Sequence, residues 1–140
     1  MPKKKPQIEL YSYGIYDTWD RASRELPKLK EITTVIPVTP EIEFGYVLKI
    51  KKAKGSILSF TINHPPFFNE EGDIAPPFDG EEFVNSNDWS FFLGDTVWPP
   101  YEDKAGEWEL ISWLDGKEIA RKTFSLKLVD EVGLGKTTKA

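Results

Sequence analysis

The sequence of 140 residues contains no cysteine and only one histidine, His64. Without cysteine there can be no disulfide, no catalytic thiol and no thiolate metal site. A single histidine also excludes a His pair or a His-based metal cluster. A Ser-His-Asp arrangement stays formally possible, but no Gly-x-Ser-x-Gly elbow or similar nucleophile context accompanies it. We therefore expect His64 to be a strand-end residue held by neighbouring backbone, and we expect no cofactor, no metal and no catalytic residue.

Basic residues and long apolar runs are also scarce. Lys and Arg number 18 against 23 Asp and Glu, which gives a net charge of −5 at pH 7. Phosphate binding needs a dense positive surface, so a nucleic-acid partner is disfavoured. No stretch approaches the length of a membrane span, and no apolar segment follows the basic residues 3–5 as it would in a signal peptide. We expect a soluble, cytoplasmic protein with no membrane partner; a leader cleaved ahead of this sequence stays an open alternative.

Two motifs suggest ligands but are better explained otherwise. Residues 130–137 have the lettering of a helicase-type phosphate-binding loop, yet Asp130 replaces the first glycine of that motif. We expect a flexible tail there. Six acidic residues between positions 70 and 82 could gather around calcium, but their spacing does not match the EF-hand loop. We expect a solvated acidic loop instead.

The clearest strand signal lies in residues 106–128, where two strand-like runs meet at Asp115-Gly116. An Asp-Gly pair is a strong hairpin turn signal because its backbone tolerates positive φ. A shared inward face requires one residue more than a strict two-residue turn, since a one-residue slip would turn every side chain over. We therefore predict a three-residue turn at 115–117. The predicted inward face contains Trp108, Leu110, Ser112, Ala120, Phe124 and Leu126.

The rest of the chain predicts further short strands. Residues 41–51 alternate cleanly and predict a half-buried strand, paired as a second hairpin with 56–63. Residues 8–17 carry large side chains on both faces and suit a strand buried on both sides. Residues 64–87 lose the alternation and predict one long loop rich in proline and phenylalanine. The complete set of about seven predicted strands is 8–17, 31–38, 41–51, 56–63, 88–93 and the two strands within 106–128.

Several short antiparallel strands with no long helix and no βαβ alternation predict an all-β protein. We expect an immunoglobulin-like antiparallel β-sandwich with long loops rich in proline and aromatic residues. The expected organisation is a flexible N-terminus at 1–7, one sandwich domain at 8–129 and a flexible tail at 130–140.

An ordered set of motifs then points to a family. The set is Tyr13-Gly14-Ile15-Tyr16, Phe44-Gly45-Tyr46, His64-Pro65, Gly106-Glu107-Trp108, Trp113, Asp115-Gly116-Lys117, Ala120 and Phe124. In this order and over residues 8–128, the sequence resembles the bacterial domain-of-unknown-function family numbered 3859. The resemblance implies an immunoglobulin-like sandwich and no established activity, so it brings no catalytic residues with it.

Aromatic and apolar residues outside the predicted core are the candidate contact sites. On the outer face of the 106–128 hairpin, three large apolar residues lie among charges, and either another segment covers them or they mark a protein contact. Five aromatic residues lie in loops, where they could anchor a partner, stack on sugars or simply pack. The candidate partner-binding residues are Ile111, Trp113, Ile119, Trp98, Tyr101, Phe67, Phe68 and Phe78.

The sequence therefore predicts a non-catalytic protein-interaction module that binds a protein partner or associates with itself, for example as a homodimer. An alternative is a carbohydrate-binding module that uses Trp98 and Tyr101, in which case the partner would be a glycan. An enzyme of unknown class comes third, because no complete catalytic constellation is present.

Overall fold

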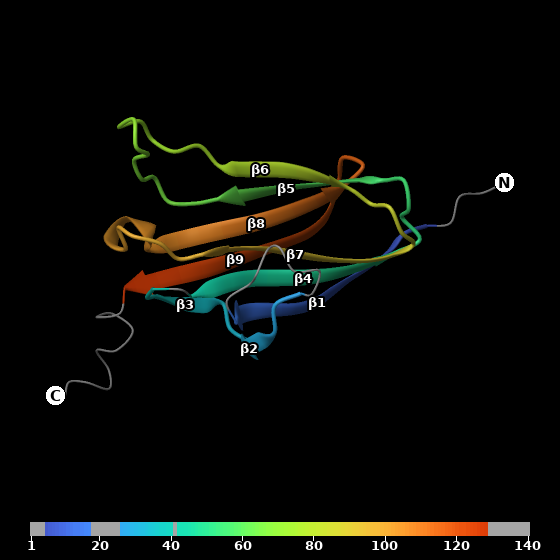
Figure 1. Cartoon of the computed structure of the whole chain (residues 1–140), viewed down its shortest axis with the longest axis horizontal. Coiled ribbons are helices and arrows are strands. Elements are labelled where there is room, and N and C mark those ends of the chain that lie inside the picture. Colours follow the sequence, from blue (N-terminus) through green and yellow to red (C-terminus); the bar gives the residue numbers. More distant parts are fainter. Residues whose placement is uncertain (1–4, 18–25, 41, 129–140) are drawn as a thin grey trace.

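The computed structural model describes residues 5–17, 26–40 and 42–128, and within these ranges the chain forms two packed β-sheets (Figure 1). The first sheet has the strand order β2-β1-β4-β7 and the second has the order β3-β9-β8-β5-β6. The elements are β1 (Gln7–Tyr16), β2 (Leu29–Glu31), β3 (Val35–Val38), β4 (Glu43–Lys51), β5 (Ile57–Asn63), β6 (Phe78–Phe83), β7 (Asp88–Thr96), η1 (Glu102–Lys104), β8 (Gly106–Leu114) and β9 (Lys117–Leu128).

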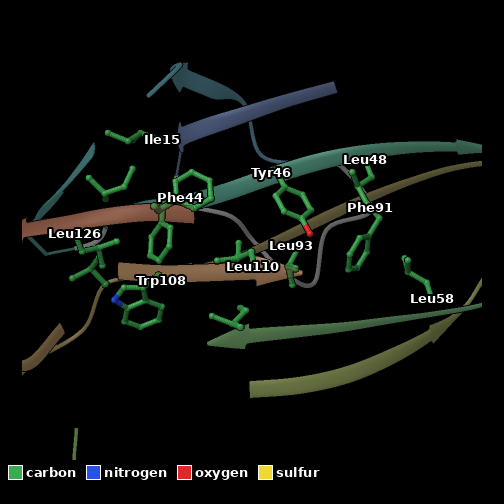
Figure 2. Close-up of a cluster of buried hydrophobic side chains, with 14 of the residues drawn as sticks. Ile15, Phe44, Tyr46, Leu48, Leu58, Phe91, Leu93, Trp108, Leu110 and Leu126 are labelled. Carbon is green, nitrogen blue, oxygen red and sulfur yellow. The ribbon is translucent and has the colours of Figure 1, made fainter. Parts of the chain in front are cut away.

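The core fills the space between the two sheets. Phe44 of the first sheet packs edge-on against Trp108 of the second, with ring centroids 5.5 Å apart (Figure 2). It also packs edge-on against Phe124 of the second sheet at 5.6 Å. One polar bridge joins the layers, because the hydroxyl oxygens of Tyr46 and Ser112 lie 2.6 Å apart. Burial raises the pKa of the Tyr46 phenol well above its usual range. The predicted all-β sandwich is therefore confirmed, although the pair β3 and β9 is parallel.

The turn of the β8–β9 hairpin differs from its prediction. Trp108 pairs with Phe124 and Ser112 with Ala120, as the predicted inward face requires. However, the turn contains only two residues, Asp115 and Gly116, with φ of 50° and 83°. The extra residue is in β9, where the register shifts next to Ser112. The three-residue turn was wrong because positive φ at both positions makes a two-residue turn that matches the strand twist, while a bulge supplies the additional residue.

Burial on both faces belongs to β4 and not to β1. The predicted inward residues of β4 are buried, but Val47 on its other face is also 2% exposed. Val47 packs there with Tyr16 and Phe92, and Leu26 covers this small second core. The first half of β1 is mostly exposed. The half-buried prediction for 41–51 failed because strand alternation reveals nothing about a segment that covers the outer face of the sheet.

Two pairing predictions were also wrong. The strands β4 and β5 lie in different sheets, so residues 52–56 cross the sandwich instead of closing a hairpin. The predicted loop 64–87 contains the edge strand β6, which pairs with β5. Its alternation is hidden because Gly80 occupies an inward position, where the ring of Phe60 lies across it. Phe78 and Glu82 occupy the inward positions on either side.

Several predictions fall outside the described residues. These include most of the flexible N-terminus, the tail with the phosphate-loop lettering at 130–137, and part of the connection 18–30. In the part of the chain that the structure describes, no helix is long and apolar enough to cross a membrane.

Candidate functional site

Aromatic side chains fill one end of the sandwich, where residues 64–77 and 97–105 meet; we call this the loop end (Figure 1). Phe67 stacks on His64 with 4.3 Å between ring centroids, and it meets the edge of Trp98 at 5.8 Å. Trp98 in turn contacts Phe78 at 6.1 Å and Trp108 at 6.2 Å. Three of the predicted loop contacts, Phe67, Phe78 and Trp98, are therefore packed on one another and on the core.

A buried cation completes this cluster. Lys104 is 1% exposed, and its Nζ donates hydrogen bonds to the Pro100 carbonyl oxygen at 3.0 Å and to Asp103 Oδ1 at 2.8 Å. The same ammonium lies 4.5 Å from the ring centroid of Phe67 and 4.7 Å from that of Trp98. Such cation–π contacts stabilise most when they are desolvated. The protein's own lysine thus already lies over one face of each of these two rings.

His64 stabilises the base of the loop 64–77. Its Nδ1 lies 2.8 Å from the carbonyl oxygen of Pro65, and its Nε2 lies 2.8 Å from that of Pro76. The ring therefore connects the beginning and the end of residues 64–77. This geometry agrees with the expected strand-end histidine held by backbone, and it uses both ring nitrogens.

Residues 67–75 form a small hydrogen-bonded hairpin, which we call the hairpin tip. The Ala75 N–H donates to the Phe67 carbonyl at 2.8 Å, and Asn69 Oδ1 accepts from two backbone N–H groups in the turn, each at 3.0 Å. Between these bonds, Phe68 and Ile74 pair across the hairpin. Their side chains are 70% and 61% exposed. Of the predicted loop contacts, only Phe68 is largely exposed, and Ile74 beside it was missed.

The predicted outer-face group does not form one exposed patch. Ile111 is 5% exposed and lies on the strand pair that Arg121 spans by its 2.6 Å ion pair with Glu109. Trp113 is half-buried. Ile119 packs against the main core, because the register shift in β9 changes its direction. Tyr101, the remaining predicted contact, is also half-buried against the core.

A cleft opens between the two sheets along the side formed by β6 and β7. Its volume is about 540 Å³. It is lined by Phe60, Ile62, Phe78, Glu82, Phe91, Phe92, Leu93, Gly94, Asp95 and Trp98. Burial raises the pKa of the Glu82 carboxyl. Within residues 5–17, 26–40 and 42–128, no group of His, Asp and Glu side chains is arranged to hold a metal ion.

A sequence signal for this side was available and was missed. Between Lys54 and Lys104 there are ten acidic residues and not one Lys or Arg. This segment supplies β5, β6, β7 and both long loops. The acidic residues were considered only within the 64–87 loop, whereas the segment without Lys or Arg extends from residue 55 to residue 103.

Comparisons with known proteins agree with this architecture. An immunoglobulin-like protein from Pseudomonas aeruginosa superposes with a TM-score of 0.71 at 17% identity, covering 89% of this chain and 98% of that chain. This likeness shows the fold alone. An alkylpurine DNA glycosylase from Pseudomonas fluorescens, AlkC, solved bound to DNA containing an abasic site analog, gives a TM-score of 0.38 at 13% identity, covering 67% of this chain and 28% of that one. That score is too low to carry an argument.

No curated protein matches the sequence. The profile of one family does match, and its description is a domain of unknown function, DUF3859. The match runs over residues 4–126 and so contains nearly every strand described above. Both expectations drawn from the ordered motifs, the family and the immunoglobulin-like fold, are therefore confirmed, and the chain belongs to the DUF3859 family.

Proposed function

We propose that this protein is a non-catalytic interaction module that binds a protein partner through the hairpin tip. The observation that carries the proposal is the exposed pair Phe68 and Ile74, which a network of backbone hydrogen bonds keeps side by side in water. Exposed apolar side chains on an ordered hairpin lose little conformational entropy when a partner covers them. Large aromatic anchors of this kind supply much of the binding energy in protein interfaces.

The base of the hairpin tip supports this role. Phe67 and Ala75, the neighbours of the exposed pair, are buried and joined by a hydrogen bond. Phe67 also contacts His64 and the ammonium of Lys104. The hairpin tip is thus mounted on the aromatic cluster, and the exposed pair has a fixed position relative to the sandwich. Acidic residues 70, 71 and 73 lie between Phe68 and Ile74 in the sequence and favour a partner with basic groups at the rim of its pocket.

A glycan is a weaker candidate. Stacking on sugar would require an open aromatic face, whereas Trp98 already contacts Phe67, Phe78, Trp108 and Lys104. Tyr101 is half-buried. The protein-binding proposal needs neither of these rings to be free, so we favour it over carbohydrate binding.

The test replaces the exposed pair and follows binding and stability separately. A Phe68→Ser, Ile74→Ser double variant should unfold within about 0.5 kcal/mol of the parent, as exposed surface changes usually do. A photoreactive amino acid at position 68, introduced in the cells that make the protein, should give a discrete cross-linked product that Ile74→Ser diminishes. Light scattering of the purified protein across a concentration series shows whether the chain associates with itself. A protein that stays monomeric would mean that the cross-linked product contains a different protein.

A matched control lies on β6, where Phe83 is 57% exposed on the outward face. A photoreactive residue at position 83 should not give the same product. If both positions give the same set of products, or if position 68 gives none, the hairpin tip is not the contact surface.

A further inference from the structure

The two lateral sides of the sandwich differ. On one side, residues 32–34 carry the chain from β2 in the first sheet directly to β3 in the second, which closes that side. On the opposite side, β7 and β6 are the edge strands of the two sheets, and the cleft of about 540 Å³ lies between them. Figure 1 shows β6 and β7 joined by a connection at the end away from the loop end. Between that connection and the loop end, no described segment of the backbone runs from one sheet to the other on this side.

Both edges can accept another strand. Among the described residues, β7 pairs only with β4, and β6 pairs only with β5. Proteins commonly guard a free edge with proline, with lysine or with a charge that points inward. The nine residues of β7 contain neither proline nor lysine, and the one charge on its inward face is Asp95, opposite Phe44 near the C-terminal end of the strand. An extended segment from another chain could therefore continue the first sheet by hydrogen bonding to β7, as in other cases of β-strand addition.

The charge of this side selects the chemistry of such a segment. Residues 55–103 contain ten acidic side chains and no Lys or Arg, and five of the ten lie on β6 and β7. The other residues of the chain contain all 18 basic side chains, against 13 acidic ones. A surface with charges of one sign attracts a partner of the opposite sign and repels one of the same sign. The segment that fits the cleft is therefore basic.

Glu82 places part of this charge at the mouth of the cleft, where its side chain stays largely exposed. It lies opposite Leu58, whose side chain is buried in the core, so Glu82 faces the inside of the sandwich. Unlike Asp79 on the same strand, which accepts a hydrogen bond from Thr61 at 2.7 Å, Glu82 has no hydrogen-bond or ion-pair partner among the described residues. This carboxylate is therefore free to pair with a cation that enters the cleft.

The aromatic lining narrows the choice of cation. Phe60, which is half-buried and lies opposite Gly80 next to Glu82, lines the same cleft. A guanidinium group can stack flat on an aromatic ring while it donates two hydrogen bonds to one carboxylate, which the ammonium of lysine cannot do. Arginine therefore uses this combination of groups more completely than lysine does.

We propose that the cleft binds an extended, arginine-bearing segment of a partner protein, which adds to the edge of β7 as a further strand and sets one guanidinium against Glu82. This inference rests on the proposed role in protein binding but concerns a surface separate from the hairpin tip. A second copy of this chain is a poor occupant, because a two-fold contact through β7 would bring the acidic residues Asp88 and Asp95 of the two copies toward each other with no basic residue on either strand.

The experiment is an NMR titration of the ¹⁵N-labelled protein with a synthetic hexapeptide, acetyl-Thr-Val-Arg-Val-Thr-Val-amide. The amides of β7 and the indole N–H of Trp98 should shift as the peptide is added. Replacing arginine with citrulline, which has the same shape without the charge, should weaken binding at least about ten-fold, as should Glu82→Gln. The lysine version of the peptide should bind more weakly than the arginine version.

Glu81→Gln is the matched control, because Glu81 directly precedes Glu82 in β6. It pairs with Ser59 and points away from the cleft. Its effect on the peptide affinity should be less than about two-fold, and Phe68→Ser should have a similarly small effect. Equal losses for Glu81→Gln and Glu82→Gln would overturn the proposal in favour of a general charge effect. An absence of shifts at millimolar peptide would also overturn it. So would self-association that increases in Glu82→Gln without a change in peptide affinity, because Glu82 would then only guard the edge.

Discussion

Aromatic side chains hold the loop end of the sandwich together, whereas hydrogen bonds donated by backbone N–H groups hold the opposite end, where residues 52–56, 84–87 and 115–116 connect the strands (Figure 1). We call this second region the turn end. Its N–H groups of Lys52 and Gly55 donate to the carbonyls of Asn87 and Val84 at 2.9 and 2.7 Å. At the loop end, four aromatic rings surround the ring of Phe67 and the ammonium of Lys104 lies over it.

The difference explains where exposed apolar groups can be displayed. The short turns of the turn end contain too few residues to form a loop that projects from the sandwich. An aromatic cluster can support a longer loop from below, as it supports the hairpin tip through Phe67. The loop end is therefore the region where a substitution in the support and a substitution in the displayed surface should have separate effects, on stability and on binding respectively.

The largest effect is expected for Trp108→Ala. The Trp108 ring is fully buried and contacts Phe44, Phe67 and Trp98, and its Nε1 donates to the Lys104 carbonyl at 2.8 Å. Removing a buried Trp side chain destabilises a protein by about 3–5 kcal/mol. Unfolding in urea should therefore show a midpoint far below that of the parent protein.

Trp113→Ala is the control on the same strand. Trp113 is on the outer face and half-buried. Its replacement should lower the free energy of unfolding by about 1 kcal/mol, a common value for partly exposed sites. Equal losses of unfolding free energy for the two variants would mean that the outer face of β8 contributes as much to stability as the core. The aromatic cluster of the loop end would then have no special role in stability.

Replacing Lys104 separates charge from packing at the loop end. Lys104→Ala removes the cation, its two hydrogen bonds and the stem that lies among the rings, so the free energy of unfolding should fall by about 2–3 kcal/mol. Lys104→Met keeps an unbranched stem and should cost about 1 kcal/mol. The comparison is read from urea unfolding curves at equal pH and salt. Equal losses would show that the ammonium, and not the stem, stabilises this end.

The sequence predicted the core-facing strands better than the edge strands. The inward faces of β4, β5, β8 and β9 followed from strand alternation, because a core-facing strand must place an apolar residue at every second position. The edge strand β6 was missed because its inward positions include Gly80 and Glu82, so that it lacks the pattern that identifies a strand. The residues of an edge strand need not all pack into the core, so hydrophobic periodicity does not detect such a strand.

The candidate surface was harder to predict than the fold. Exposed Phe68 and buried Phe67 are neighbours in the sequence, and only the hydrogen bonds of the hairpin tip decide which one faces water. The buried Lys104 gave no sequence signal, because its partners are a carbonyl, a neighbouring Asp and two rings that folding brings together. The bulge that turns Ile119 toward the core depends in the same way on the register of two strands.

A smaller effect is expected at the turn end from Asn87→Ala. The Asn87 side chain accepts one hydrogen bond, from the Lys54 N–H at 3.0 Å, while its backbone carbonyl keeps the bond from Lys52. The loss of one such bond should lower the free energy of unfolding by about 1 kcal/mol. Amide hydrogen exchange should become faster at Lys54 and stay unchanged at Ala75 in the hairpin tip. Faster exchange at both ends would show that the two ends are coupled and would break the comparison.

The smallest effect concerns Glu82, which lines the cleft together with Trp98 of the loop end. Burial raises the pKa of this carboxyl in the folded protein, so the folded state keeps its proton to higher pH than the unfolded state does. Stability therefore falls as the pH rises from the ordinary carboxyl pKa through the raised one. Glu82→Gln cannot ionise and should melt about 1–2 °C above the parent at pH 7, a small gain because the group is partly solvated.

At pH 3 that difference should disappear, because the carboxyl is then protonated in both states. Glu81→Gln should show no such pH-dependent gain, since Glu81 points away from the cleft. Calorimetry of the three proteins across this pH range provides the measurement, and a gain that persists at pH 3 would attribute it to packing. With the arginine peptide bound at saturation the order at pH 7 should invert, because a guanidinium favours the charged carboxylate that the empty cleft disfavours.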